Sequence, residues 1–268
     1  MRTWQGKWAL VTGASAGIGA ALARELAAGG AHLVLTARRK ERLERLAQEL
    51  GSKHNIKTEI VVADLARPNE REKIFAFTGE KGIEVELLVN NAGFGAYGEF
   101  VRTDAQRLLE MVEVNCAAVV HLSRLYLPQM MDRRHGDMLI VASTAAFQAV
   151  PYISAYAATK GFDLLVAEGL AEEMKPYGVR VCALCPGSTE SEFQEVAGQT
   201  KVAASYRRQE KAEKVARTGL KALAAGRSYV ISGVANYWGV QGQRLAPRGL
   251  VARIAASMFR PESLRAKT

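Results

Sequence analysis

Residues 7–19 read KWALVTGASAGIG, and this stretch decides the fold. Lys7 to Thr12 is a short apolar run typical of a buried strand, and the alanine- and leucine-rich segment from Ala20 to Ala28 is typical of a helix. Between them stands a Gly-x-x-x-Gly-x-Gly loop, in which glycine lets the backbone turn sharply and approach a phosphate, while the free N–H groups of the helix start attract an anion. We predict a dinucleotide-phosphate site whose loop residues are Gly13, Ser15, Gly17, Ile18 and Gly19.

The rest of the chain repeats this alternation of strand and helix. Further strands are predicted at 32–36, 58–63, 86–90, 137–143 and 179–184, and helices at 38–50, 68–77, 104–131 and 155–174. This order predicts an α/β fold, a single-domain Rossmann-like doubly wound parallel sheet with helices on both faces. We expect residues 1–268 to form one dinucleotide-binding and catalytic domain, with 188–217 as a substrate lid and 233–268 as a basic C-terminal extension.

Composition excludes several classes of protein. With 268 residues, 49% hydrophobic and 24% charged, the chain is expected to be an ordinary globular protein. No apolar run approaches the roughly 18 residues of a membrane-spanning helix, and no secretory signal pattern follows Met1, so we expect a cytoplasmic protein. Cys182 and Cys185 stand three apart in a predicted strand and should point to opposite faces, which predicts buried free thiols and no metal site.

The positive charge is concentrated in the last quarter of the chain. From Lys201 to Thr268 there are 14 Lys and Arg against 3 Asp and Glu, a net +11, whereas the preceding residues carry 22 against 24, a net −2. A solvated basic helix face and a landing surface for an acidic partner are both consistent with this excess. Leu250, Ile254 and Met258 follow one another at i, i+4 and i+8, which is typical of an interfacial helix or, more often, of a helix packed on its own or a neighbouring subunit.

Two arginines decide the nature of the cofactor. An Asp or Glu that binds the 2′-hydroxyl of NAD is expected about 20 residues after the glycine loop. Here the second predicted strand ends in Ala37, Arg38 and Arg39. Guanidinium groups neutralise a 2′-phosphate and offer it paired donors, so the sequence predicts NADP(H) rather than NAD(H), with Arg38 and Arg39 as its contacts.

The glycine loop also matches a competing motif. Gly13 to Gly17 reads Gly-x-Ser-x-Gly, which is the nucleophile elbow of α/β-hydrolases. That chemistry needs a histidine late in the chain, but the last of the four histidines is His135. A hydrolase is therefore the weaker interpretation.

Three further residues predict acid–base chemistry. Ser143 ends a strand, and Tyr156 and Lys160 lie one turn apart on the helix that follows. A nearby ammonium favours the phenolate and lowers the pKa of a tyrosine, which can then exchange a proton with a carbonyl or an alcohol.

In this combination the chain resembles the short-chain dehydrogenase/reductase family. The resemblance rests on Thr12 to Gly19, Asp64-Leu65, Asn90 to Gly93, Asn115, Ser143, Tyr156 with Lys160, and Pro186-Gly187, in the family's order and spacing, and it covers about Lys7 to Phe193.

The resemblance implies a role for each matched residue. Tyr156 would be the general acid for carbonyl reduction, Lys160 would depress its pKa and hold the nicotinamide ribose, Ser143 would bind the substrate oxygen, and Asn115 would hold a water of the proton relay. The remaining cofactor contacts implied are Asp64, Leu65, Asn91, Ala92, Gly93, Pro186, Gly187, Thr189 and Ser191. The family usually has an aliphatic residue and then a threonine where Thr189 and Ser191 stand here, so Ser191 keeps a hydroxyl in place of the threonine.

The substrate is less well defined by the sequence. Phe193, Val196, Val202 and Tyr206 of the lid, together with Phe94, Phe147, Val150 and Tyr152 of other loops, are expected to face the cleft. Such a wall suits a carbonyl with an apolar body, and the basic tail suits an acyl carrier protein or a coenzyme A thioester. We expect NADPH-dependent reduction of a ketone or 3-oxoacyl group. Dehydrogenation of small hydroxy acids or hydroxy amino acids, reduction of a steroid-like ketone, and a catalytically silent NADP-sensing scaffold are the alternatives.

The resemblance also implies a homo-oligomer, either a dimer or a tetramer. We expect no nucleic acid as a partner, because the tail contains no nucleic-acid module, and we do not expect a membrane partner.

Overall fold

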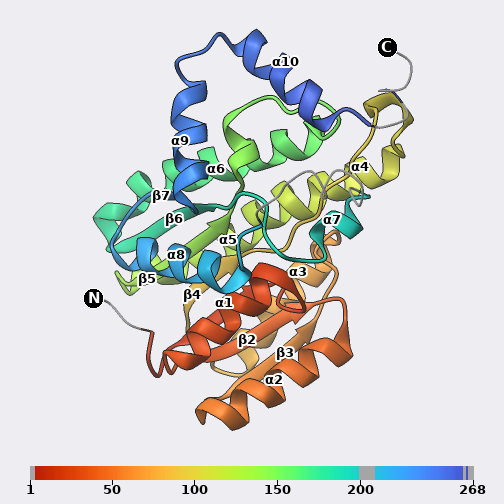
Figure 1. Ribbon diagram of the computed structural model, residues 1–268. Coiled ribbons are helices and arrows are strands. Elements are labelled where there is room, and N and C mark those ends of the chain that lie inside the picture. Colours follow the sequence, from red (N-terminus) through yellow and green to blue (C-terminus); the bar gives the residue numbers. More distant parts are fainter. Residues whose placement is uncertain (1–3, 199–208, 262–263, 265–268) are drawn as a thin grey trace.

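A parallel sheet of seven strands organises the molecule (Figure 1). The computed structural model describes residues 4–198, 209–261 and 264. The strand order is β3-β2-β1-β4-β5-β6-β7. The strands are β1 (Trp8–Thr12), β2 (His32–Ala37), β3 (Thr58–Val62), β4 (Val85–Asn90), β5 (Gly136–Val141), β6 (Val179–Cys185) and β7 (Tyr229–Ile231). The predicted doubly wound fold is confirmed; the short β7 was not predicted.

The order of the strands places the site. The chain runs outward from β1 to β3, then returns past β1 to continue with β4 to β7, so the direction of winding reverses between β1 and β4. The loops that follow these two strands diverge and leave a crevice at their carboxyl ends, which is where ligands bind in sheets of this kind. The glycine loop follows β1, and Asn91 to Gly93 follow β4.

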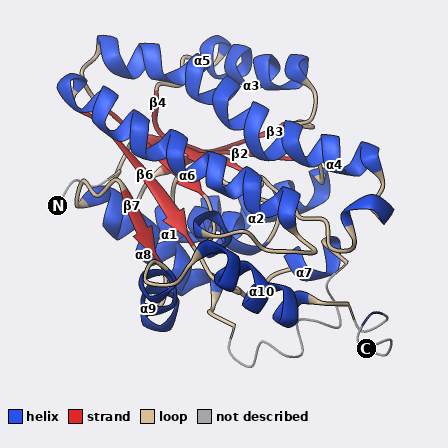
Figure 2. Cartoon of the chain, turned by 90° about the horizontal axis from the view of Figure 1, so that it is seen from above, coloured by secondary structure: helices blue, strands red, loops and turns tan. Residues whose placement is uncertain are grey.

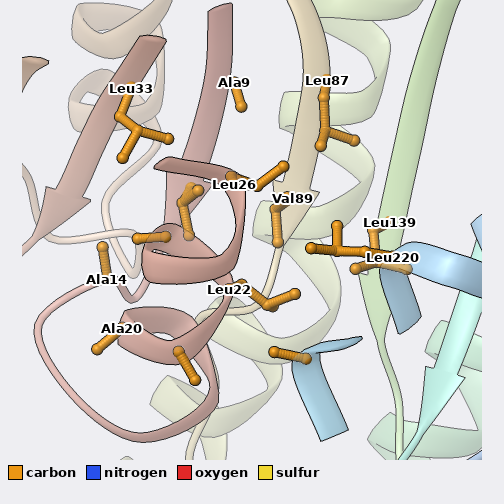
Figure 3. Packing of buried hydrophobic residues seen from close by; sticks show 14 of the residues in the cluster. Ala9, Ala14, Ala20, Leu22, Leu26, Leu33, Leu87, Val89, Leu139 and Leu220 are labelled. Atoms are coloured by element: carbon orange, nitrogen blue, oxygen red, sulfur yellow. The ribbon is translucent and has the colours of Figure 1, made fainter. Parts of the chain in front are cut away.

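Helices cover both faces of the sheet. α1 (Gly17–Ala28), α2 (Lys40–His54) and α8 (Ala212–Ala224) pack on one face, and α3 (Pro68–Glu80), α5 (Ala118–Asp132) and α6 (Ser154–Met174) on the other. Figure 2 shows α3 and α5 on the opposite side of the strands from α1 and α8. In Figure 3, Leu22 and Leu26 of α1 and Leu220 of α8 face Leu33, Leu87 and Leu139 of the sheet.

Strand β6 contributes to both layers of the core. Cys182 packs with α1 and α8, whereas Cys185 packs with the opposite cluster, as the period of two in a strand predicts. Both thiols are free and fully buried. Burial raises the pKa of Cys182 to about 12 and raises that of Cys185 further.

The helix predicted over 104–131 is interrupted. Asp104 caps α4 (Ala105–Val112), whose last turn runs into a π-helical segment, Glu113–Ala117, before α5 begins. Asn115 lies in that segment, with its side chain fully buried. A π-turn inserts one residue into a helix, and such insertions are frequent at functional sites.

The described part of the chain after β6 contains four helices, α8 among them. α7 (Phe193–Val196) is short, and Thr189 bridges Glu210 as the chain returns to the sheet. α8 begins at Ala212, so the last residues of the predicted lid belong to a helix packed on α1. Val202 and Tyr206 lie outside the described residues. α9 (Val234–Gln243) and α10 (Arg248–Phe259) complete the fold, and no described helix combines the length and the apolarity that crossing a bilayer requires.

Short 3-10 turns join several of these elements. Their bounds are Phe100–Arg102, Thr144–Phe147 and Lys175–Tyr177.

Candidate active site

The glycine loop is shaped to receive a phosphate. Gly13 and Gly17 have φ values of +65° and +54°, in the left-handed region that glycine adopts without strain. A Cβ atom at Gly19 would lie 2.3 Å from the carbonyl oxygen of Gly13, so no side chain fits there. The first turn of α1 has neither a side-chain cap nor an acidic residue, which leaves its N–H groups and its positive dipole end for an anion.

The loop after β4 holds the glycine loop in place. The Asn91 side-chain amide donates to the Thr12 carbonyl oxygen at 2.8 Å. In return, Thr12 Oγ1 accepts from the backbone N–H groups of Asn91 and Ala92 at 2.9 and 3.0 Å. Asn90, in contrast, donates to Ser123 Oγ inside the core, which makes it a structural residue.

One cavity of about 450 Å³ opens above these loops. Every residue predicted to contact the cofactor lines it, from Gly13 of the first loop to Ser191 beyond β6. Ser143, Tyr156 and Lys160 line the same cavity. Asn115 does not.

An acid from the predicted lid, Glu192, pairs with one of the two arginines predicted to contact the cofactor. Arg39 donates to Ser15 Oγ at 3.1 to 3.2 Å and forms a 2.7 Å ion pair with Glu192. Arg42, in the first turn of α2, donates to the other oxygen of Glu192. These hydrogen bonds, first from Arg39 and then from Arg42, hold the pKa of Glu192 below its usual value. The sequence predicted neither Arg42 nor Glu192, since they stand 150 residues apart and no spacing rule connects them.

Ser143 and Tyr156 are neighbours in the lining of the cavity, and their side chains form a hydrogen bond. Ser143 ends the segment after β5, and its Oγ accepts from Ala145 N–H at 3.1 Å and donates to the Pro186 carbonyl oxygen at 3.5 Å. Tyr156 lies in the first turn of α6, with its ring 5.1 Å from that of Phe193. Burial raises the pKa of Tyr156, and Lys160 and the hydrogen bond with Ser143 offset this only in part. The predicted contribution of Lys160 therefore has the right sign, but the predicted net lowering of the pKa is wrong because it left out burial.

Lys160 has a buried partner that the sequence analysis missed. Its Nζ donates to the Val141 carbonyl oxygen and to Asp163 Oδ2, both at 2.8 Å. Burial alone would lower the pKa of Lys160, but Asp163 and Tyr156 reverse this and raise it, so the ammonium is charged at neutral pH. The sequence does contain a signal for this pair. Asp163 stands three residues after Lys160, on a face of the helix that Leu164 and Ala167 otherwise make apolar.

Asn115 clamps two elements together. Its side-chain oxygen accepts from Phe94 N–H, and its amide donates to the Phe94 carbonyl oxygen and to Thr159 Oγ1, at 3.0 to 3.1 Å. These bonds tie the loop after β4 to α6 next to Lys160. The predicted role of Asn115 in holding a water stays a prediction.

The substrate end of the cavity is apolar. Phe94, Phe193 and Val196 line it as predicted, and Phe259 of α10 joins them. Three residues predicted to face the cleft are absent from its lining: Phe147, Val150 and Tyr152. Phe147 instead packs with Tyr229, and Val150 is buried against α10.

Known proteins identify the family. Residues 7–202 match the family model described as short chain dehydrogenase. The chain belongs to the short-chain dehydrogenase family. The predicted family is thus confirmed, and the glycine loop and cavity described above fit the nicotinamide dinucleotide that members of this family bind.

The relatives of this short-chain dehydrogenase include several very-long-chain 3-oxoacyl-CoA reductases. It is 37% identical over 185 residues to very-long-chain 3-oxoacyl-CoA reductase-B of Danio rerio and 34% identical over 185 residues to the very-long-chain 3-oxoacyl-CoA reductase of Homo sapiens. Each match covers 68% of this chain and 59% of the relative, so the match spans about three fifths of the relatives' length.

Solved structures match over nearly the whole chain. A short-chain dehydrogenase from Sphingobium yanoikuyae in complex with NADPH superposes with a TM-score of 0.81 at 30% identity, covering 91% of this chain and 94% of that one. A 7β-hydroxysteroid dehydrogenase superposes with a TM-score of 0.85 at 25% identity, covering 94% and 98%.

Proposed function

We propose that this short-chain dehydrogenase uses NADPH to reduce the keto group of a 3-oxoacyl thioester. The observation that carries the proposal is the meeting of Ser143, Tyr156 and Lys160 in one cavity whose other end presents Arg38 and Arg39 and no acid from β2. The similar structure in complex with NADPH and the 3-oxoacyl-CoA reductases among the relatives support this choice.

The residues of the chain manage the oxygen and the proton. Ser143 Oγ and the Tyr156 hydroxyl hold the substrate carbonyl oxygen, and Tyr156 donates its proton to that oxygen as the alcohol forms. Lys160, fixed by Val141 and Asp163, stabilises the phenolate left behind and holds the nicotinamide ribose. NADPH, when bound, supplies the hydride. Phe94, Phe193 and Phe259 exclude water from the reacting carbon.

The charge balance favours a thioester carrier. Coenzyme A and acyl carrier proteins are acidic, and the net charge of residues 201–268 is +11. Binding of a small hydroxy acid does not require a positively charged surface of this extent. A steroid-like ketone is the second candidate, since a hydroxysteroid dehydrogenase superposes on this chain and the substrate end of the cavity is apolar.

The test is the initial rate of NADPH oxidation with one 3-oxoacyl chain, presented on coenzyme A, on an acyl carrier protein and as a short free thioester. We expect a preference for the acidic carriers that high salt abolishes. A rate with small hydroxy acids or steroid ketones that exceeds the rate with all three thioesters would contradict the substrate class.

Two variants test the assignments within this reaction. Tyr156→Phe removes only the exchangeable proton and should abolish most turnover while leaving NADPH binding intact. Arg38→Asp should shift the preference toward NADH. Retained turnover in the first variant, or an unchanged cofactor ratio in the second, would contradict the respective role; NADPH binding without turnover of any carbonyl in the wild-type protein would indicate the silent scaffold.

A further inference from the structure

Helices α9 and α10 carry a large exposed apolar surface, here called the docking face. The two helices lie together at one end of the molecule, far from α2 (Figure 1). The docking face consists of side chains that are 43% to 92% exposed: Val234, Tyr237, Trp238, Leu245, Leu250, Ile254 and Met258. Trp238 is 67% exposed and Leu245 is 92% exposed. Monomeric soluble proteins rarely expose large apolar side chains together in one patch. Both helices lie beyond residue 202, where the match to the family model ends.

The spacing gathers these residues on the outer side of each helix. Val234, Tyr237 and Trp238 share one face of α9, while Val240 is buried. On α10, Leu250 and Ile254 lie one turn apart on the outer side, while Ala255 packs inward against Val150 and Ile153. The exposed stripe is thus separate from the stripe that attaches the helices to the protein.

The charge around the docking face has one sign. The sequence from Lys214 to Pro261 contains no Asp or Glu. Arg244, Arg248 and Arg253 are exposed on and between the two helices. An apolar stripe that includes Tyr and Trp and is bordered by arginines is the pattern of a helix that lies in the interface of an anionic bilayer.

We propose that the docking face binds the surface of a membrane that contains anionic lipids. A second copy of the chain fits less well, because a two-fold contact through this face would bring arginines together with no acid between them. An acidic carrier protein would satisfy the arginines but would leave no reason for the exposed Trp238, Leu245 and Ile254.

The docking face adjoins the mouth of the active-site cavity. Phe259, at the end of α10, lines that cavity, and Tyr97 Oη donates to the Phe259 carbonyl oxygen at 2.9 Å. A bilayer on the docking face would therefore lie next to the substrate entrance. If the proposed function holds, a 3-oxoacyl substrate with a long chain can enter from the lipid. Membrane binding is measured without substrate, so its test does not depend on the proposed function.

The experiment is co-sedimentation of the 268-residue chain with vesicles of phosphatidylcholine alone or mixed with phosphatidylglycerol. We expect binding to the mixed vesicles that increases at low salt and weak binding to the neutral ones. The double charge reversal Arg248→Glu with Arg253→Glu, and separately Leu245→Ser with Trp238→Ser, should each reduce the bound fraction about tenfold, because charge and apolar burial both contribute. Arg45→Glu on α2, at the other end of the molecule, is the matched control and should bind as the wild type does.

A spectroscopic signal keeps the test independent of sedimentation. In the variant Trp4→Phe with Trp8→Phe, Trp238 is the only tryptophan, and its emission should shift to the blue on mixed vesicles. NADPH binding by all variants shows that they are folded. The proposal is wrong if the wild type does not bind mixed vesicles, if the two double variants bind as well as Arg45→Glu, or if the substitutions instead abolish self-association or binding of acyl carrier protein.

Discussion

At the scale of single residues, Asp163 adds to the rise that burial causes in the pKa of Tyr156, the proposed general acid. Its charge raises the pKa of Tyr156, in the same direction as burial and against Lys160. Asp163→Asn keeps an acceptor for Lys160 but removes a charge that raises the pKa values of both Tyr156 and Lys160. While Lys160 stays protonated, the pKa of Tyr156 should fall. Because a general acid must be protonated, the loss of reductase activity at alkaline pH should begin at a lower pH in the variant. The pH profile of kcat measures this, with Glu168→Gln on the same helix as control; coincident profiles would contradict the role.

Glu192 occupies the arginine that we propose as a contact of the NADPH 2′-phosphate, Arg39. We expect the 2′-phosphate to displace this carboxylate from Nη1 of Arg39, which donates to Glu192 Oε2. The ion pairs are more than a third exposed, so each contributes at most about 1 kcal/mol. Glu192→Gln should therefore lower KM for NADPH by about twofold to fivefold and leave KM for NADH unchanged. Initial-rate titrations with both cofactors check this, and an equal change for the two would show that Glu192 acts on the lid instead.

The sequence predicted the residues that belong to short motifs and missed those that depend on folding. Ser143, Tyr156 and Lys160 stand in one fixed order along the chain, so a pattern finds them. Glu192 meets Arg42 across 150 residues, which no local pattern records. The net pKa of Tyr156 was mispredicted for the same reason, since burial is a property of the fold rather than of the spacing.

At the scale of elements, the contact between α1 and the turn before it leaves no room at Gly19. An added Cβ would lie 2.3 Å from the Gly13 carbonyl oxygen and 2.5 Å from the Asn91 amide, so the first turn of α1 would have to move. Gly19→Ala should lower the free energy of unfolding by about 1–3 kcal/mol and weaken NADPH binding. Gly79→Ala in α3, where nothing lies within 4 Å, is the control and should stabilise by up to about 1 kcal/mol. Urea unfolding measures both; equal stability of the two variants would contradict the clash.

Elements with strong periodicity were predicted, and short or irregular ones were not. Six strands and the long helices carry continuous apolar patterns, and each appears within a few residues of its predicted bounds. β7 has only three residues, and the π-segment Glu113–Ala117 breaks the period in the middle of a helix. Neither leaves a distinct pattern, because pairing with β6 and the clamp of Asn115 on Phe94 stabilise them from outside.

At the scale of the whole molecule, α4, α5 and α6 leave apolar side chains on the surface. Leu109 is 62% exposed and Leu165 is 69% exposed, and Val112, Val120 and Phe162 are also exposed. We predict that these helices form the interface of a dimer or tetramer. Leu165→Glu should convert the oligomer to a monomer, whereas Leu245→Ser should not. Light scattering decides, and a monomeric wild-type protein would contradict the prediction.

The two thiols of β6 lie in different halves of the core, one on each side of the sheet. Because both are buried and protonated, an alkylating reagent can modify either only after its own layer has separated from the strands. The rates of alkylation at Cys182 and Cys185 therefore report how often each layer opens. We expect equal rates, as in a single cooperative unit; faster alkylation at one cysteine would mean that its helices detach before the rest of the protein unfolds.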